Sequence, residues 1–295
     1  MSSMTGRGRP VVAIVQAAGP IHLGRSGGPS PLAGRSIGSD SLSAALRGVA
    51  EDDKVETVVL RVDSPGGSAV ASDAIHREIL RLKEKKPVVA SMGSVAGSGG
   101  YFISMPCTEI VSNATTLTGS IGVLAGKQVT QGGLDRLGIH RALVSTGPFA
   151  GMLSSQRGFT EQEWDLLSRF LDDVYADFTR KAADDRGMSI DQLEPLARGR
   201  VWSGAQAADI GLVDRVGGLS DAVLRACALA DIDPDEADTR ISPKLGPLDR
   251  FMPAENSNSP VASLFGEGHA LVDRAMASLG LGSTGVLTMA PIRWR

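Results

Sequence analysis

Short apolar runs alternate with amphipathic stretches through the first third of the chain. The apolar runs lie at 10–21, 55–63 and 87–93, and each has the length of a β-strand. The stretches between them, about 41–50 and 69–86, place apolar side chains three or four residues apart, as one face of a helix requires. Strand, helix, strand, helix, strand with short connections is typical of a parallel sheet built from βαβ units.

The pattern between residues 108 and 146 is less regular. It predicts short strands at 108–114, 116–124 and 140–146 and a helix over 133–139. The glycine-rich stretch from His22 to Ser39 is interpreted as a mobile loop. These elements extend the same α/β pattern, so the chain is assigned to the α/β fold class.

The clearest helical signal begins at Thr160, which forms a capping-box pattern with Glu163. The apolar positions that follow at helical spacing are Trp164, Leu167, Leu171, Val174 and Phe178. The pattern runs to about Asp185, which makes a long helix. Packing into the core and an interface with another chain both account for its apolar face.

The last part of the chain changes character. A final helix is predicted at 219–230, and residues 231–295 are rich in Pro, Gly, Ser and Asn, with one helical stretch near 264–280. We therefore predict a disordered start at 1–10, a single domain at 11–230 and a C-terminal docking tail at 231–295.

Composition excludes several function classes. A net charge of −3 argues against a generally basic nucleic-acid binder. Two cysteines and four scattered histidines cannot make a disulfide framework or a spaced metal site, so no metal and no cofactor is predicted. The longest early apolar run is too short to span a membrane and no leader pattern is present, so the chain is expected to be soluble.

Three glycine-centred clusters follow predicted strands, at 64–68, 97–101 and 118–122. In open α/β sheets, binding sites lie at the carboxyl ends of the strands. An ordinary turn also accounts for any one of these clusters taken alone. None of them matches a phosphate-binding loop or a dinucleotide fingerprint.

Ser98 is the serine best placed for chemistry, because it follows a strand and opens a helix. The N–H of Gly99 would face a developing oxyanion, and Gly66 or Gly67 could provide a second N–H. The pentapeptide AGSGG differs from the esterase pattern GxSxG, and no histidine lies in a supporting motif. Lysine is then the remaining common base for a serine nucleophile.

Four motifs taken together resemble the signal peptide peptidase A (protease IV) family of Ser-Lys peptidases. They are RVDSPGGS, KPVVASMGSVAGSGGYFIS, TLTGSIGV and GRVWSGAQAADIGLVDRVGG. The resemblance covers roughly residues 10–230 and implies a ClpP/crotonase-like fold. It implies Ser98 as nucleophile, Gly99 with Gly66 and Gly67 as oxyanion-hole donors, and Ser120 as the serine that holds the base. The motif around Trp202 is interpreted as a packing and turn signature.

The general-base lysine is where the chain departs from the family. The corresponding segment, 145–152, contains no lysine. Of the seven lysines in the chain, only Lys127 lies near a motif. The resemblance is to the serine-bearing second half of long, tandem family members, in which the first half supplies the lysine.

We therefore expect a serine endopeptidase, or half of one, that cleaves apolar peptides such as signal-peptide remnants. The lysine would come from a lysine-bearing first-half polypeptide or from a neighbouring copy in a homo-oligomer. Relatives are membrane-associated, so membrane contact is expected only through a partner. Two alternatives stay open: a catalytically inactive module that binds peptides or shapes an assembly, and a crotonase-type acyl-CoA enzyme.

Overall fold

The computed structural model describes residues 9–26 and 35–242, which form two compact units. The first unit holds the described residues up to Val123 and from Val174 onward, and the second is Leu124–Asp173. Residues 1–8 of the predicted disordered start at 1–10, and the helical stretch near 264–280, lie outside the described residues.

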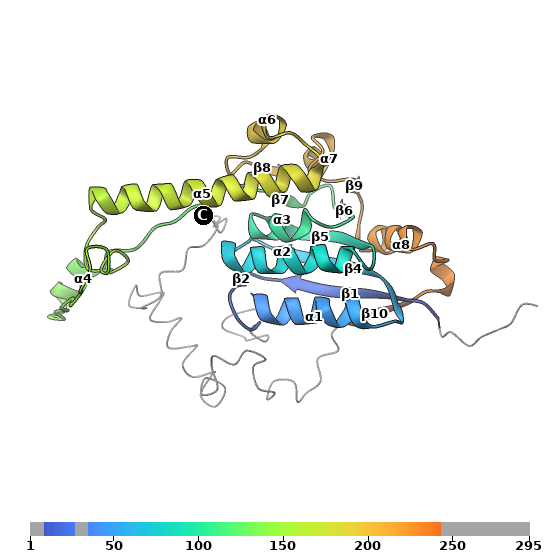
Figure 1. Ribbon diagram of the computed structural model, residues 1–295, viewed down its shortest axis with the longest axis horizontal. Coiled ribbons are helices and arrows are strands. Elements are labelled where there is room, and N and C mark those ends of the chain that lie inside the picture. Colours follow the sequence, from blue (N-terminus) through green and yellow to red (C-terminus); the bar gives the residue numbers. More distant parts are fainter. Residues whose placement is uncertain (1–8, 27–34, 243–295) are drawn as a thin grey trace, which may run out of the picture. The chain divides into compact units, whose positions relative to one another are not determined.

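The first unit is built on a parallel sheet (Figure 1). Its strands along the main path, in spatial order, are β10 (Asp238–Ser242), β1 (Val11–Ala18), β4 (Val55–Ser64), β5 (Val88–Gly97), β6 (Glu109–Ser112) and β9 (Arg215–Val216). All neighbours on this path are parallel, which confirms the predicted βαβ units. β10 belongs to the sheet although it lies in the segment predicted to be a tail.

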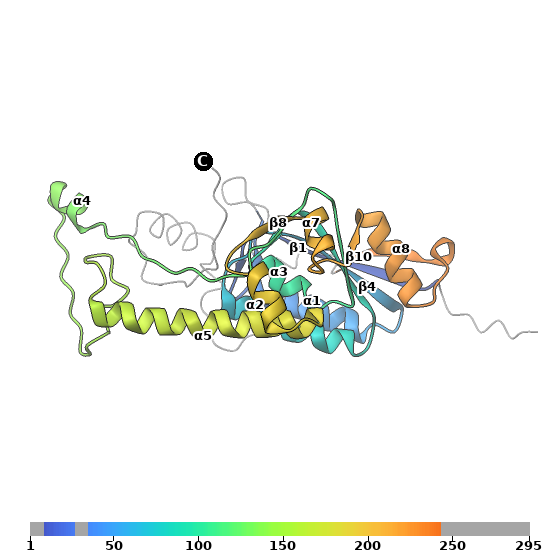
Figure 2. The same ribbon diagram turned by 90° about the horizontal axis from the view of Figure 1, so that it is seen from above.

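Helices cover both faces of this sheet (Figure 2). α1 (Ser39–Glu51), α2 (Ala69–Lys83) and α3 (Gly99–Ser104) pack on one face through a core that includes Leu46 and Ile79. α8 (Leu219–Leu229) packs on the other face against side chains such as Val59. A parallel sheet covered on both faces needs near-continuous apolar strands, which is the pattern that β1, β4 and β5 show.

Strand β5 changes neighbours along its length. Val89–Met92 pairs with β6, and Val95–Gly97 pairs with β7 (Leu117–Gly119). β7 in turn pairs antiparallel with β8 (Val201–Ser203), which leads into α7 (Gly204–Asp209). The change of partner strand falls at residues 93 and 94. Next to it, Val95 N donates a hydrogen bond to the Asp63 carboxylate at 3.1 Å.

The described residues of the stretch from His22 to Ser39, predicted to be a mobile loop, include two short strands. β2 (Ile21–His22) and β3 (Ile37–Gly38) form a two-stranded parallel sheet. Ile21 also bridges to the backbone around Gly67, where its N–H donates to Gly66 O at 2.9 Å. The sequence around Ile21 therefore lies beside the first glycine cluster.

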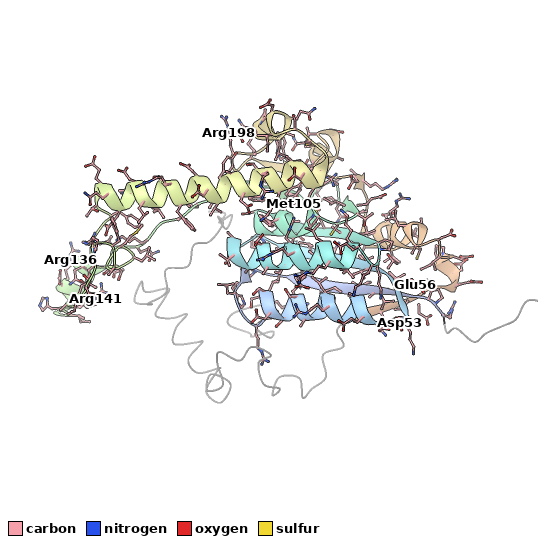
Figure 3. The ribbon with its side chains drawn as sticks, in the orientation of Figure 1. Asp53, Glu56, Met105, Arg136, Arg141 and Arg198 are labelled. Carbon is pink, nitrogen blue, oxygen red and sulfur yellow. The ribbon has the colours of Figure 1, made fainter. Side chains whose placement is uncertain are left out.

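The second unit has little regular structure before its helix. α4 (Gln131–Arg136) is short, and Arg141, labelled in Figure 3, donates to Ser155 Oγ at 3.0 Å and to Thr130 Oγ1 at 3.1 Å. The strand predicted at 140–146 is wrong, because these residues pair with no strand. Their exposed apolar side chains find no neighbouring strand on which to form a ladder.

The long helix α5 (Glu161–Arg186) agrees closely with its prediction. The capping box is present: Thr160 N donates to Glu163 Oε2 at 2.8 Å, and Glu163 N donates to Thr160 Oγ1 at 3.2 Å. The helix continues into the first unit, where Phe178 is fully buried against Phe102. The remaining short helices are α6 (Ile190–Leu193), η1 (Glu194–Leu196) and η2 (Pro234–Glu236).

Candidate active site

Ser98 forms a sharp turn between the end of β5 and the start of α3. Its φ of 54° and ψ of −117° are rare for any residue that carries a side chain. Such a conformation costs about 1–3 kcal/mol and persists only where the surroundings impose it. The chain therefore holds this serine in a strained turn at the carboxyl end of a parallel strand.

The Ser98 side chain is buried and lacks a hydrogen-bond partner. The residue is 1% exposed, and its Oγ is one of two buried side-chain polar atoms without a partner in the described part of the chain, with His76 Nδ1. Buried polar atoms in proteins are almost always paired. An unpaired hydroxyl in a strained turn is thus free to engage a ligand or a base.

The first glycine cluster lies directly against this turn. A Cβ added to Gly66 would lie 2.7 Å from Gly99 N and 2.8 Å from Ser98 Cβ, and Gly66 has a φ of +98°. Only glycine fits this position, for reasons of both space and conformation. Gly66 N already donates to Ser64 Oγ at 3.2 Å, so its contribution to the site is space and not a donor.

Gly67 and Gly99 are the better donors. The bonds between the first cluster and Ile21 use Gly66 O and the N–H of Ser68, which leaves the N–H of Gly67 available. The N–H of Gly99 lies in the first turn of α3, where a helix provides no acceptor. A Cβ on Gly99 would lie 3.2 Å from Gly67 N, so the two glycines are neighbours.

Ser120 follows the partner strand of β5. Gly97 and Gly119 are register partners, and Ser98 N donates to Gly119 O at 2.9 Å. Ser120, the next residue, is 7% exposed and has a φ of 51°. The two strands β5 and β7 thus end side by side and each is followed by a serine with positive φ.

The structure therefore brings all five predicted site residues to one end of the sheet. Sequence reasoning missed Gly119, whose carbonyl holds the Ser98 turn. The signal was present in the third cluster, TGSIG, but nothing in the sequence says which backbone carbonyl faces Ser98. It also missed Ser72, whose Oγ lies 2.7 Å from the Cβ position of Gly99 and donates to Ser68 O.

Four lysines lie at the opposite end of the sheet. They are Lys54, Lys83, Lys85 and Lys86, which precede β4 or β5. β5 has ten residues, so at about 3.3 Å per residue these amines are on the order of 30 Å from Ser98. Lys86 Nζ donates to Val49 O and Asp52 O, at 2.8 and 2.7 Å. These lysines cannot act as the base within their own chain.

Lys181, on α5, is held by two carboxylates. Its Nζ lies 2.5 Å from Asp73 Oδ1 and 2.6 Å from Asp177 Oδ2. Burial by itself would lower the pKa of Lys181, but the two carboxylates outweigh it and raise that pKa. A lysine that stays protonated is a poor general base.

Lys127 belongs to the second unit. Its Nζ donates to Met152 O at 2.6 Å and lies 4.2 Å from the centroid of the Phe159 ring. Burial lowers the pKa of Lys127. Both the carbonyl and the ring favour the charged ammonium, so the amine is engaged within its own unit. Lys244 lies outside the described residues.

The described residues contain no group of three or more His, Cys, Asp or Glu side chains arranged to hold a metal ion. Across 9–26 and 35–242, no helix combines the length and the apolar character that a bilayer span requires. The chemistry that the site can support is carried by a serine hydroxyl and backbone N–H groups.

The sequence of residues 80–233 matches Peptidase family S49. The chain is 40% identical over 226 residues to "Serine protease SPPA, chloroplastic" of Arabidopsis thaliana, covering 76% of this chain and 33% of that protein. It is 38% identical over 197 residues to "Protease 4" of Salmonella typhi, covering 66% and 32%. A Synechocystis protein named as a protease, slr0021, is 37% identical, covering 70% and 76%.

The chain thus spans about a third of the length of the first and second of these relatives and about three quarters of the third. Among solved structures, a ClpP1 mutant from Listeria monocytogenes is similar with a TM-score of 0.47 and 17% identity, covering 71% of this chain and 93% of that one. The family match includes the Ser98 turn, the third glycine cluster and the motif around Trp202. On these matches, the chain belongs to peptidase family S49.

Proposed function

We propose that this chain is the serine-bearing half of a serine endopeptidase with Ser98 as its nucleophile. One observation carries the proposal: Ser98 lies in a strained turn with an unpartnered Oγ, beside two glycine N–H groups. Membership of a peptidase family and the names of its relatives point to the same activity.

The chemistry follows from the geometry. Ser98 Oγ attacks a peptide carbonyl carbon while a base takes its proton, and the carbonyl oxygen becomes an oxyanion between the N–H groups of Gly67 and Gly99. The base returns the proton to the leaving amine, which departs and leaves an acyl-enzyme. Water, deprotonated by the same base, then hydrolyses the ester and regenerates Ser98.

A lysine from outside this unit completes the site. Of the six lysines in the described residues, four lie at the far end of the sheet, Lys181 is held by carboxylates, and Lys127 is bonded to Met152 O within the second unit. A separate first-half polypeptide or a second copy of this chain would supply the amine next to Ser120. Extended apolar peptides, such as signal-peptide remnants, are the proposed substrates.

The second unit supports assembly. It exposes eleven large apolar side chains: Leu124, Val129, Leu137, Ile139, Leu143, Val144, Phe149, Leu153, Trp164, Leu166 and Phe170. Leu166 and Phe170 are four residues apart on α5, so they share one helix face. An apolar surface of this kind marks a contact with another protein. We assign that contact to the lysine donor.

The test is labelling with a fluorophosphonate probe, read by mass spectrometry. The chain is labelled alone and after co-expression with a lysine-bearing first-half polypeptide, with Ser98→Ala as the control. Labelling of Ser98 only in the complex supports the half-site. Labelling of the chain alone shows that the chain or its homo-oligomer provides the base, and Lys127→Ala then asks which amine is used.

A second candidate function is an inactive module that binds peptides or shapes an assembly. The lysine-free segment at 145–152 and the 1% exposure of Ser98 favour it. Failure to label Ser98 both alone and in the complex, from well-folded samples, would overturn the peptidase proposal in favour of this module.

A further inference from the structure

The hydrogen bond from Ser98 N to Gly119 O raises the question of what holds Gly119. β7 has three residues and pairs with the last residues of β5 on one side and with β8 on the other. The backbone of Gly119 has a φ of +76°, and that of Ser120 a φ of 51°. Two consecutive residues with positive φ do not continue a strand, so neighbouring segments must hold them in place.

The backbone before β8 provides part of that support. Ser120 N donates to Arg200 O at 2.7 Å, and Gly199 N donates to Ile121 O at 2.8 Å. These residues follow Arg198, whose φ is 59° and which Figure 3 labels. The turn at 198–200 thus binds the residues just after β7 through its backbone.

Trp202 provides the side-chain part. The pyrrole edge of its indole lies close to Gly119: a Cβ added there would be 2.8 Å from Trp202 Cδ1 and 3.7 Å from Trp202 Nε1. The same edge of the ring is tied down, because Nε1, which is bonded to Cδ1, donates to Leu196 O at 3.0 Å. The ring is therefore held between η1 and Gly119, and it packs against the main core.

Backbone hydrogen bonds also hold both ends of β8: those of residues 199 and 200 before it, and the bond from Gly204 N to Thr116 O at 2.8 Å after it. The strand has three residues and pairs with β7, and Val201 is 42% exposed. A short strand at a sheet edge opens locally at low cost unless a buried side chain anchors it. Trp202 is half-buried and packs against the main core, so it is the side chain that anchors β8.

We propose that Trp202 is a positioning residue for the reactive turn: its indole holds Gly119, and Gly119 O holds the N–H of Ser98. Trp202 does not touch the reacting atoms. The catalytic consequence rests on the proposed function, whereas the structural linkage from Trp202 to Ser98 does not. The motif around Trp202 thereby has a role in the site as well as in packing.

The linkage is tested by amide hydrogen exchange in the full chain, read on fragments that isolate Ser98 and Ser120. Trp202→Ala should speed exchange of both amides by on the order of tenfold, because the local opening becomes easier. Trp202→Phe keeps a smaller ring in the place of the indole and loses the bond to Leu196 O, so it should restore part of the protection. Val223→Ala, which truncates a side chain packed on the opposite face of the sheet, is the matched control.

The two alanine variants are compared at equal loss of melting temperature. The proposal would be overturned if the Ser98 amide exchanged no faster in Trp202→Ala than in Val223→Ala. Equal exchange in Trp202→Ala and Trp202→Phe would also overturn it. The catalytic consequence is read in whichever sample labels Ser98: Trp202→Ala should lower the limiting labelling rate by about tenfold at unchanged probe affinity. If the parent protein never labels, the peptidase proposal fails and the exchange result still decides the linkage.

Discussion

The candidate site and the second unit differ in how crowded their glycines are. Around the candidate site, Gly66, Gly99 and Gly119 each have a neighbouring atom within 2.8 Å of the place where a Cβ would stand. In the second unit, five glycines have nothing within 4 Å: Gly126, Gly132, Gly133, Gly138 and Gly158. Crowded glycines are required by close backbone approach, whereas open ones mark a chain that makes few contacts.

The apolar side chains differ in the same direction. The first unit buries a large core on both faces of its sheet, while Leu167 is the one buried large apolar side chain in the second unit. A unit that exposes most of its apolar side chains is incomplete by itself. The comparison therefore separates a region that holds the strained Ser98 turn from a region whose exposed apolar surface we assign, in the proposed function, to a contact with another chain.

The largest expected effect comes from filling a crowded glycine. Gly66→Ala would place a methyl group against Ser98 and Gly99 at a φ of +98°. We expect a loss of about 2–4 kcal/mol in the free energy of unfolding. The methyl group would displace Gly99, whose N–H is one of the two proposed oxyanion donors. Labelling of Ser98 should therefore fall on the order of a hundredfold.

Denaturant melts and labelling rates measure this, with Gly132→Ala as the matched control in the second unit. That control should leave both quantities unchanged. If Gly66→Ala and Gly132→Ala lowered stability and labelling equally, the difference between crowded and open glycines would have no functional meaning.

The next effect concerns the exposed apolar surface. Leu166→Ser combined with Phe170→Ser removes an apolar pair on one helix face and should weaken assembly about tenfold or more. Light scattering over a range of micromolar concentrations measures the shift in mass. A parent protein that is monomeric at all these concentrations, with and without the first-half polypeptide, would contradict the assignment of this surface to a partner.

A smaller effect is expected at the strained serine. Ser98→Gly removes the side chain from a positive-φ position, so the folded state should gain about 1 kcal/mol in stability while labelling is lost. Thermal unfolding compared with Ser98→Ala measures it. A Ser98→Gly protein that is no more stable than Ser98→Ala would show that the turn carries no strain.

The smallest effect is pH-dependent and local to the start of α5. Hydrogen bonds from Arg157 and from the Thr160 backbone hold the pKa of Glu163 at about 2, below its usual 4.5. A carboxylate with a lowered pKa stabilises the folded helix start while it is ionised. The contribution of Glu163 is therefore present above pH 4.5 and is lost as the pH falls towards 2.

Amide exchange at the helix start, compared between the parent and Glu163→Gln, should differ at pH 6 and converge near pH 2.5. A difference that persists unchanged at low pH would show that the ion pair is not its source.

Much of the fold could be predicted from local pattern. The apolar runs of β1, β4 and β5 have strand length, and the capping box at Thr160 marks the start of α5 to within a residue. The wrong strand at 140–146 arose because an apolar run predicts a strand only if a neighbouring strand is available to pair with it.

The candidate site could be predicted only in part. Serine and glycine clusters at strand ends indicate where chemistry gathers, and Ser98, Ser120 and the glycines do gather there. Two features of the site depend on pairings between distant strands. They are the carbonyl that holds the Ser98 turn and the packing against Gly119 of an indole that lies 83 residues further along the chain. Local periodicity carries no information on such pairings.

The division of β5 between two partners has a consequence for how the protein can change. Its first half is bound to the body of the sheet through β6, and its last residues are bound to a small, exposed pair of strands. The overall resistance to unfolding and the alignment of the serine are therefore set by different hydrogen bonds of one strand. If Ser98 is the nucleophile, as proposed, substitutions in β7 and β8 would act on its alignment more than on the core of the sheet, so reactivity and stability could evolve separately.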